Sequence, residues 1–82
     1  MSETSCLRIP KTYGEEGLAL AKKMGLLNSE FRIQREQDFL YIPLTREPLV
    51  NELNELKLTM PKLEICKRQF LERVERQAKI VD

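Results

Sequence analysis

The sequence predicts a small α+β domain, a two-layer sandwich in which a sheet of about four strands carries helices on one face. Short segments with alternating apolar and polar residues, typical of strands with one buried face, recur along the chain. Two segments with helical spacing of apolar residues stand between them, so the order is βαββαβ, as in a ferredoxin-like sandwich. A chain of 82 residues has room for one such core.

The first strand is expected at Leu7–Ile9, where apolar and charged residues alternate, and Pro10 ends it because proline has no N–H for a ladder. Thr12 to Glu15 fits a capping box, in which each side chain accepts a backbone N–H of the other residue. We therefore expect a helix from Tyr13 to Met24, with its apolar face at Leu20, Met24 and Leu27 and a left-handed cap at Gly25.

A hairpin is expected next. Residues 31–35 alternate with period two, residues 36–38 form a polar turn, and residues 39–42 continue as a strand rich in aromatic and β-branched residues. Pro43 sets its end. Because side chains alternate along a strand, Phe39 and Tyr41 share one face and Leu40 and Ile42 share the other.

The second helix is expected to be capped by Thr45 or Glu47, to tolerate Pro48 in its first turn, and to bury Leu49, Leu53 and Leu56. Residues 63–67 alternate again and predict the fourth strand. Apolar residues recur at helical spacing after Phe70. We therefore expect one domain over residues 5–70 and a helical extension or linker over residues 71–82, leading towards domains absent from this chain.

The composition excludes several function classes. The chain has no histidine, which excludes Ser-His-Asp, Cys-His and imidazole–metal chemistry. Cys6 and Cys66 stand sixty positions apart, which matches no zinc or redox spacing; we expect two core thiols, and a disulfide cannot be inferred from a single pair. Three glycines cannot form a P-loop or a dinucleotide fingerprint. With no long apolar stretch and a polar, acidic start, we expect a cytoplasmic protein with no membrane contact, no metal and no catalytic residue.

The formal net charge is only +1, yet between Lys57 and Lys79 basic residues outnumber acidic ones seven to three. A small protein can thus have one basic face while being nearly neutral on average. Tyr13 lies beside Lys11 at the start of the expected helix, where an aromatic ring can stack on a base while N–H groups and a cation meet phosphate. The candidate RNA contacts are Lys11, Tyr13, Arg32 and Arg35, followed by Lys67 and Arg68.

Five short motifs occur in one order at nearly constant gaps, at Leu7 to Lys11, Tyr13 to Glu15, Leu26 to Asn28, Phe31 to Ile33 and Leu40 to Leu44. This series resembles the N-terminus of the archaeal tRNA (guanine-37 N1)-methyltransferases over about residues 6–44, and only loosely after Thr45.

The resemblance implies a parent enzyme that transfers a methyl group from S-adenosylmethionine to N1 of the guanine after the anticodon. It implies that this first domain contacts the tRNA elbow and thereby checks the L shape, while later domains bind the methyl donor. No catalytic or donor-binding residue can be assigned to this chain, and the resemblance does not determine which residues touch RNA.

Other functions compete with this one. The runner-up is a protein–protein docking domain that uses the free face of its sheet around Phe39–Ile42. An RNA recognition motif is rejected, because the strand at Phe39–Pro43 lacks its basic residue and glycines. An acylphosphatase-like enzyme would need a glycine-rich phosphate loop, and Pro10 to Gly14 contains one glycine.

Overall fold

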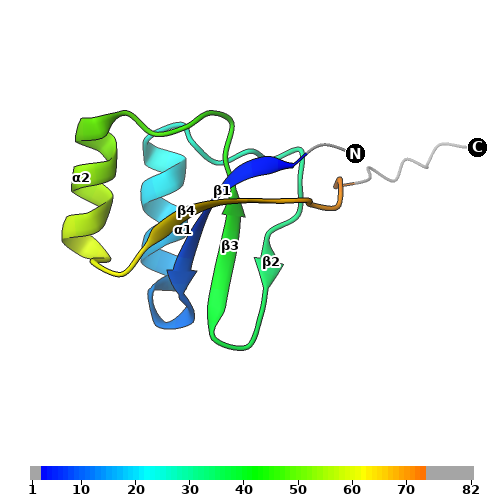
Figure 1. The fold of residues 1–82 in the computed structure, drawn as a ribbon, viewed down its shortest axis with the longest axis horizontal. Coiled ribbons are helices and arrows are strands. Elements are labelled where there is room, and N and C mark those ends of the chain that lie inside the picture. Colours follow the sequence, from blue (N-terminus) through cyan, green and yellow to red (C-terminus); the bar gives the residue numbers. More distant parts are fainter. Residues whose placement is uncertain (1–2, 74–82) are drawn as a thin grey trace, which may run out of the picture.

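The computed structural model describes residues 3–73 and forms a four-stranded sheet with two helices (Figure 1). The strands are β1 (Thr4–Pro10), β2 (Gln34–Arg35), β3 (Phe39–Pro43) and β4 (Glu64–Arg68). They pair in the order β2-β3-β1-β4, and every pair is antiparallel. The expected α+β class and the βαββαβ order are confirmed.

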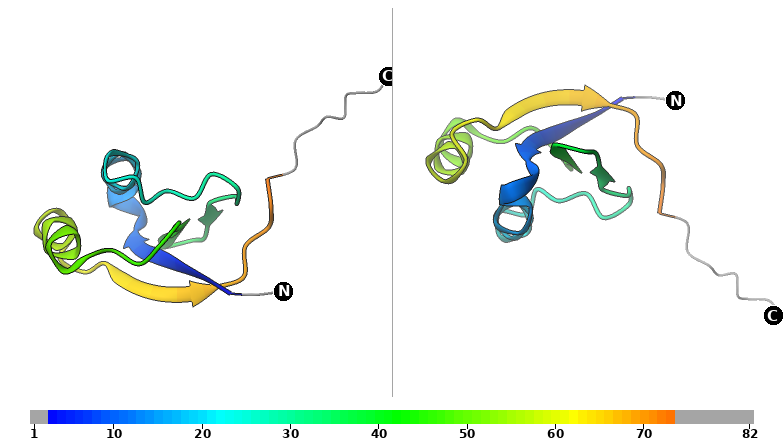
Figure 2. Two further views of the ribbon diagram at one scale, coloured as in Figure 1. Left: turned by 90° about the horizontal axis from the view of Figure 1, so that it is seen from above. Right: turned by 90° about the horizontal axis from the view of Figure 1, so that it is seen from below.

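The helices are α1 (Gly14–Lys23), which follows a 3₁₀ turn, η1 (Lys11–Tyr13), and α2 (Val50–Thr59). Both lie on the same side of the sheet (Figure 2). The first helix matches its predicted range to within one residue at each end, but the capping box at Thr12 is wrong. Thr12 already belongs to the 3₁₀ turn, so the helix begins at Gly14 with no side-chain cap.

Gly25 ends α1 as predicted, with φ of +72°. The Leu26 N–H donates to the Ala21 carbonyl at 2.8 Å and the Gly25 N–H donates to the Lys22 carbonyl at 3.0 Å. These two bonds form a Schellman cap, which requires the left-handed conformation that glycine adopts without strain.

The start of the second helix is stabilised by residues other than those predicted. Neither Thr45 nor Glu47 caps it, because its N-cap is Leu49. The Glu52 carboxylate instead accepts the Leu49 N–H at 2.9 Å and a bidentate pair of bonds from the Arg46 guanidinium at 2.8 and 2.9 Å. Of the expected apolar face, Leu56 is fully buried and Leu53 is half-buried, whereas Leu49 is exposed.

The main core fills the space between sheet and helices. Its buried members come from every layer: Leu7, Ile9, Ala21, Leu26, Leu40, Ile42, Leu44, Leu56, Met60 and Leu63. Gly17 lets α1 approach β1 closely, because a Cβ there would overlap the Ile9 Cδ1 atom and lie 3.1 Å from the Met60 sulfur. Leu40 and Ile42 of β3 belong to this core and face the helices. Phe39 and Tyr41 belong to a separate cluster and face the other way, as the alternation predicts.

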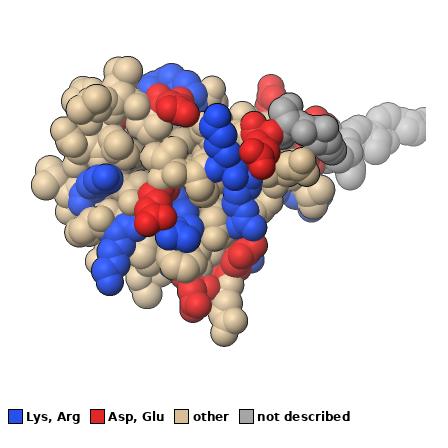
Figure 3. All heavy atoms as spheres, in the orientation of Figure 1, with Lys and Arg blue, Asp and Glu red and all other residues tan. Residues whose placement is uncertain are grey.

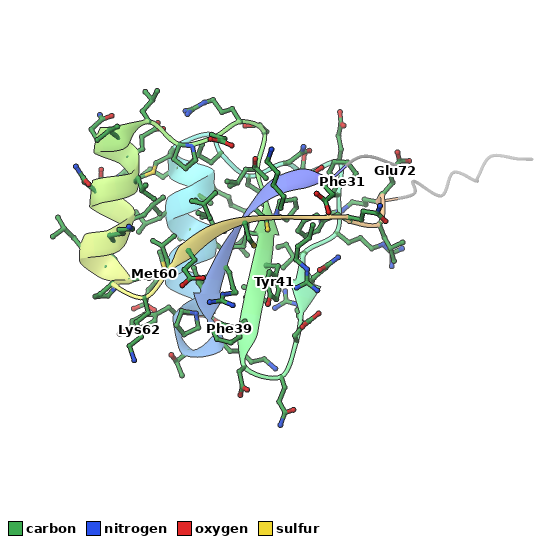
Figure 4. All side chains as sticks on the ribbon, viewed as in Figure 1. Phe31, Phe39, Tyr41, Met60, Lys62 and Glu72 are labelled. Atoms are coloured by element: carbon green, nitrogen blue, oxygen red, sulfur yellow. The ribbon has the colours of Figure 1, made fainter. Side chains whose placement is uncertain are left out.

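The opposite face of the sheet carries a second, smaller cluster of Cys6, Tyr41 and Phe70, with Phe31, Phe39 and Cys66 packed against it. Phe70 belongs to the segment after β4, which turns back onto the chain before β2. The Arg32 N–H donates to the Leu71 carbonyl at 2.9 Å, and Phe31 and Glu72 form an antiparallel bridge. Figure 4 shows Phe31 close to Glu72.

The pairing of residues 71–73 with residues 30–32 overturns two expectations. Residues 71–73 are extended rather than helical, because their backbone groups bond to residues 30–32; the rest of the expected helix, 74–82, lies outside the described residues. The hairpin strand expected at 31–35 is reduced to Gln34–Arg35, since Phe31 pairs with Glu72 and not with β3. The division of the chain at residue 70 stays a prediction. Within the described part of the chain, neither helix is long and apolar enough to cross a membrane.

Candidate nucleic-acid interface

A shallow hollow of about 350 Å³ lies at the end of the sheet where β1 passes into α1. The Lys11 N–H donates to the Asp38 carbonyl at 3.0 Å, and this bond holds η1 against the turn between β2 and β3. One wall is formed by Lys11, Gly14, Glu15 and Leu18, and the other by Arg35 and Leu40 of the hairpin. The hollow therefore joins two segments, residues 11–18 and residues 35–40, that are separate in the sequence.

Lys11 and Arg35 give the hollow its cationic character. Both side chains are exposed, and neither forms an ion pair with another described residue. The hollow also adjoins the first turn of α1, whose N–H groups receive no side-chain cap. Such N–H groups and two unpaired cations favour an anionic ligand, although Glu15 on the same wall limits the local charge.

Tyr13 directly precedes Gly14 in the chain but is not among the residues that line the hollow, and its ring is not a fully free aromatic surface. It is half-buried and packs against the main core, directly before Gly14. Only part of its ring can therefore stack on a base. Sequence reasoning placed Lys11, Tyr13 and Arg35 among the candidates, and the structure brings these three to one end of the molecule.

The remaining three candidates lie elsewhere. Arg32 is exposed beside the segment at Leu71, and Lys67 is exposed on β4, in register with Ser5 near the start of β1. Arg68 is engaged within the domain: its guanidinium lies 3.9 Å from the centre of the Tyr41 ring and pairs with Glu36 at 3.1 Å. The six candidates do not form one surface, and Figure 3 shows a face on which basic and acidic side chains are interspersed.

Arg8 is a structural residue that sequence reasoning overlooked. Its guanidinium lies 4.6 Å from the centre of the Phe39 ring and bonds to the Glu64 carboxylate at 2.6 Å. The alternation of Leu7, Arg8 and Ile9 places Arg8 opposite the main core, but only the strand pairing shows that Glu64 is its neighbour. Its Nε atom and the Gln34 Oε1 atom are buried without a hydrogen-bond partner among the described residues.

These contacts also bear on the docking alternative. The face of the sheet away from the helices was expected to be free, yet Phe70 packs on Tyr41, and Arg8 and Arg68 cover the rings of β3. Phe39 and Tyr41 can be followed along β3 in Figure 4. The face is thus largely closed by the domain's own side chains, which weakens the case for docking a partner there.

Residues 6–52 match the family model described as the tRNA methyltransferase 5 N-terminal domain. The match covers more than half of the 82 residues, so this chain belongs to that family of N-terminal domains. The resemblance carried by the short motifs is thereby confirmed.

Solved structures agree with this assignment. The chain is similar to Trm5 of Methanocaldococcus jannaschii in complex with adenosine, at 26% identity and a TM-score of 0.73 over 84% of this chain and 21% of that chain. A second structure, described as the M. jannaschii tRNA m1G37 methyltransferase, gives the same identity and TM-score and is covered over 20% of its length. Trm5b of Pyrococcus abyssi shares the fold, at 21% identity and a TM-score of 0.68 over 96% of this chain and 21% of that chain.

A search of curated proteins finds no match. The present chain spans about a fifth of the length of the solved proteins that it resembles.

Proposed function

We propose that this domain recognises the elbow of tRNA as the N-terminal RNA-binding module of a tRNA (guanine-37 N1)-methyltransferase. The proposal is supported by membership of the tRNA methyltransferase 5 N-terminal domain family and by similarity to a protein described as a tRNA m1G37 methyltransferase. In such a parent protein, S-adenosylmethionine supplies the methyl group and is bound by other domains. This domain contributes binding and the choice of substrate.

The observation that carries the proposal is the hollow at the start of α1, with Lys11 and Arg35 on its two walls and no ion pair for either cation within residues 3–73. An elbow is recognised by its shape, by stacking on exposed bases and by phosphate contacts. Phosphate contacts need only lysines, arginines and backbone N–H groups, and they carry no sequence information. The two cations and the start of α1 supply phosphate-binding groups at one place, and Tyr13 directly precedes the start of α1 in the chain.

The charge of the domain suits an auxiliary binding role. A net charge of +1 and only two cations at the hollow predict weak binding to RNA by the isolated domain. A domain tethered to a second RNA-binding site acts at a high effective concentration, so weak contacts still contribute to the overall affinity. Weak contacts also let the parent enzyme discriminate between intact and damaged tRNA without retaining either.

The test compares intact tRNA with an anticodon stem-loop that lacks the elbow, at several salt concentrations. We expect the domain to bind intact tRNA more tightly, with an affinity that falls as salt rises. The double variant Lys11→Ala/Arg35→Ala should lower the salt slope by about 2, because two phosphate contacts are lost. Lys22→Ala/Lys23→Ala removes the same charge from the exposed far end of α1 and should leave the slope unchanged.

Equal affinity for the two RNAs, or no binding at about 50 mM salt, would contradict elbow recognition. Equal effects of the two double variants would instead show that charge in general, and not the hollow, drives the binding.

A further inference from the structure

The two cysteines of the chain meet on the face of the sheet away from the helices. Cys6 of β1 and Cys66 of β4 are direct cross-strand partners in the antiparallel register, although they are sixty positions apart. Their sulfur atoms are 2.9 Å apart. The sequence predicts core thiols but not their contact, since neither spacing nor composition indicates that the first and last strands are neighbours.

The backbone geometry is compatible with a bond between them. Residues directly opposite each other in an antiparallel pair have Cα atoms about 4.5–5.5 Å apart, which lies inside the range of about 4.4–6.8 Å found in disulfides. An S–S bond is about 2.05 Å long, so the sulfurs need only a small rotation of the side chains to reach it.

We propose that Cys6 and Cys66 form a reversible redox latch, a disulfide that locks the edge strand β4 onto β1 under oxidising conditions. The proposal concerns the stability of the domain and does not depend on the RNA-binding proposal.

The chemistry proceeds by exchange with a low-molecular-weight disulfide. Cys66 is half-buried and therefore accessible; its thiolate attacks one sulfur of the small disulfide and releases one small thiolate. The Cys6 sulfur, after loss of its proton, then attacks the Cys66 sulfur and releases the second small thiolate. Two protein thiols are oxidised to one disulfide, the small disulfide is reduced to two thiols, and the two protons pass to the released thiolates.

The environment of Cys6 agrees with this order of steps. Burial raises the pKa of the Cys6 thiol to about 12, and the adjacent Cys66 side chain adds to the rise. Cys6 is therefore a poor first nucleophile. Once Cys66 is held in a mixed disulfide, its contribution to that shift is removed, while the Arg68 guanidinium continues to favour the Cys6 thiolate.

The latch acts on a strand that has one partner. Within the described residues, β4 lies at the edge of the sheet and pairs only with β1, and it leads into the segment that returns to Phe31. It also carries Arg68, which covers Tyr41. Joining β4 to β1 closes a long loop, so the disulfide should stabilise the domain mainly by restricting the unfolded chain.

The experiment incubates the 82-residue chain with excess oxidised glutathione, then blocks remaining thiols with N-ethylmaleimide and measures the intact mass. We expect a monomer that has lost two hydrogens and takes up no maleimide, and whose melting temperature is about 10 °C higher than that of the reduced chain. Dithiothreitol should reverse both changes. Because the chain has only two cysteines, an intramolecular disulfide can only join Cys6 to Cys66.

Cys6→Ser and Cys66→Ser serve as matched controls, and neither should show the rise in melting temperature. Oxidation in denaturing urea should give mainly mixed disulfides with glutathione, because the folded register no longer raises the effective concentration of one thiol at the other. The proposal is overturned if the folded chain keeps two alkylatable thiols, if Cys66 stops at the mixed disulfide, or if the main product is a disulfide-linked dimer.

Discussion

The two faces of the sheet are stabilised by different interactions. On the helix face, Leu7, Ile9, Leu40 and Ile42 are almost completely buried in one continuous apolar core. On the other face, the aromatic rings of β3 are covered by two arginine guanidiniums, each of which also pairs with a glutamate. The same strands thus supply an apolar core to one side and a layer of rings and charges to the other.

The difference between the two faces indicates which face contributes most to the stability of the domain and which face responds to solution conditions. Buried apolar area contributes about 25 cal/mol per Å², whereas partly exposed ion pairs contribute little and cation–π contacts about 0.5–1 kcal/mol. The helix face should therefore dominate the stability. The other face, with its charges and adjacent thiols, should respond to salt and oxidants.

The largest effect is expected from Leu7→Ala, which truncates a fully buried side chain between Ile42 and Ile65. We expect the free energy of unfolding to fall by about 3 kcal/mol, from lost burial and from the cavity that remains. Urea denaturation followed by circular dichroism measures it. A loss below about 1 kcal/mol would contradict the view that the helix face dominates.

A smaller effect is expected from Arg68→Ala on the other face. This variant removes the contact with the Tyr41 ring and the ion pair with Glu36, and should cost about 1 kcal/mol. Lys67→Ala, the exposed neighbour on the same strand, should change the midpoint of urea unfolding hardly at all. If both substitutions have the same effect, the guanidinium over Tyr41 does not stabilise the domain.

The smallest effect on stability is expected from losing the charge of Glu52, which lies at the start of α2. Hydrogen bonds from Arg46, and then from the Leu49 N–H, lower the pKa of the Glu52 carboxyl from 4.5 to about 2. The charged form is thus favoured in the folded state, so its stabilisation is complete above about pH 4.5 and is lost as the pH falls towards 2.

To measure this, the urea midpoints of the wild type and Glu52→Gln are compared between pH 7 and pH 2.5. The difference between them should shrink on acidification. Glu55→Gln, which removes a carboxylate at an exposed position on the same helix, is the matched control. If the difference in urea midpoint between the wild type and Glu52→Gln does not change with pH, the Arg46–Glu52 pair is not the cause of that difference.

Much of the fold could be predicted from local patterns. The alternation at Leu7–Ile9 and at Phe39–Ile42 predicts the strands and the faces of their side chains, because successive side chains of a strand point to opposite sides. Gly25 predicts the end of α1, since only glycine adopts that cap without strain. The predictions failed where distant groups compete for the backbone. Phe31 pairs with Glu72, and Glu52 rather than Thr45 or Glu47 holds the start of α2.

The spatial arrangement of the candidate RNA contacts could be predicted only in part. Exposure and charge suggested Lys11, Tyr13 and Arg35, and these lie at one end of the molecule. The same criteria suggested Arg68, whose guanidinium is occupied by Tyr41 and Glu36. A charged residue that binds a ligand and one that pairs within the domain look alike in a sequence, because the pairing depends on which strands are neighbours.

The sequence by itself determined most of the helices and strands, the α+β class and the apolar faces of β1 and β3, since these follow from the spacing of residues along a few turns or a few strand positions. Only the tertiary structure decided which strands are neighbours. The order β2-β3-β1-β4 brings Cys6 to Cys66, Arg8 to Glu64 and Lys11 to the hairpin that carries Arg35. These contacts join the beginning, middle and end of the chain, and packing of the whole core, rather than any local preference, sets them.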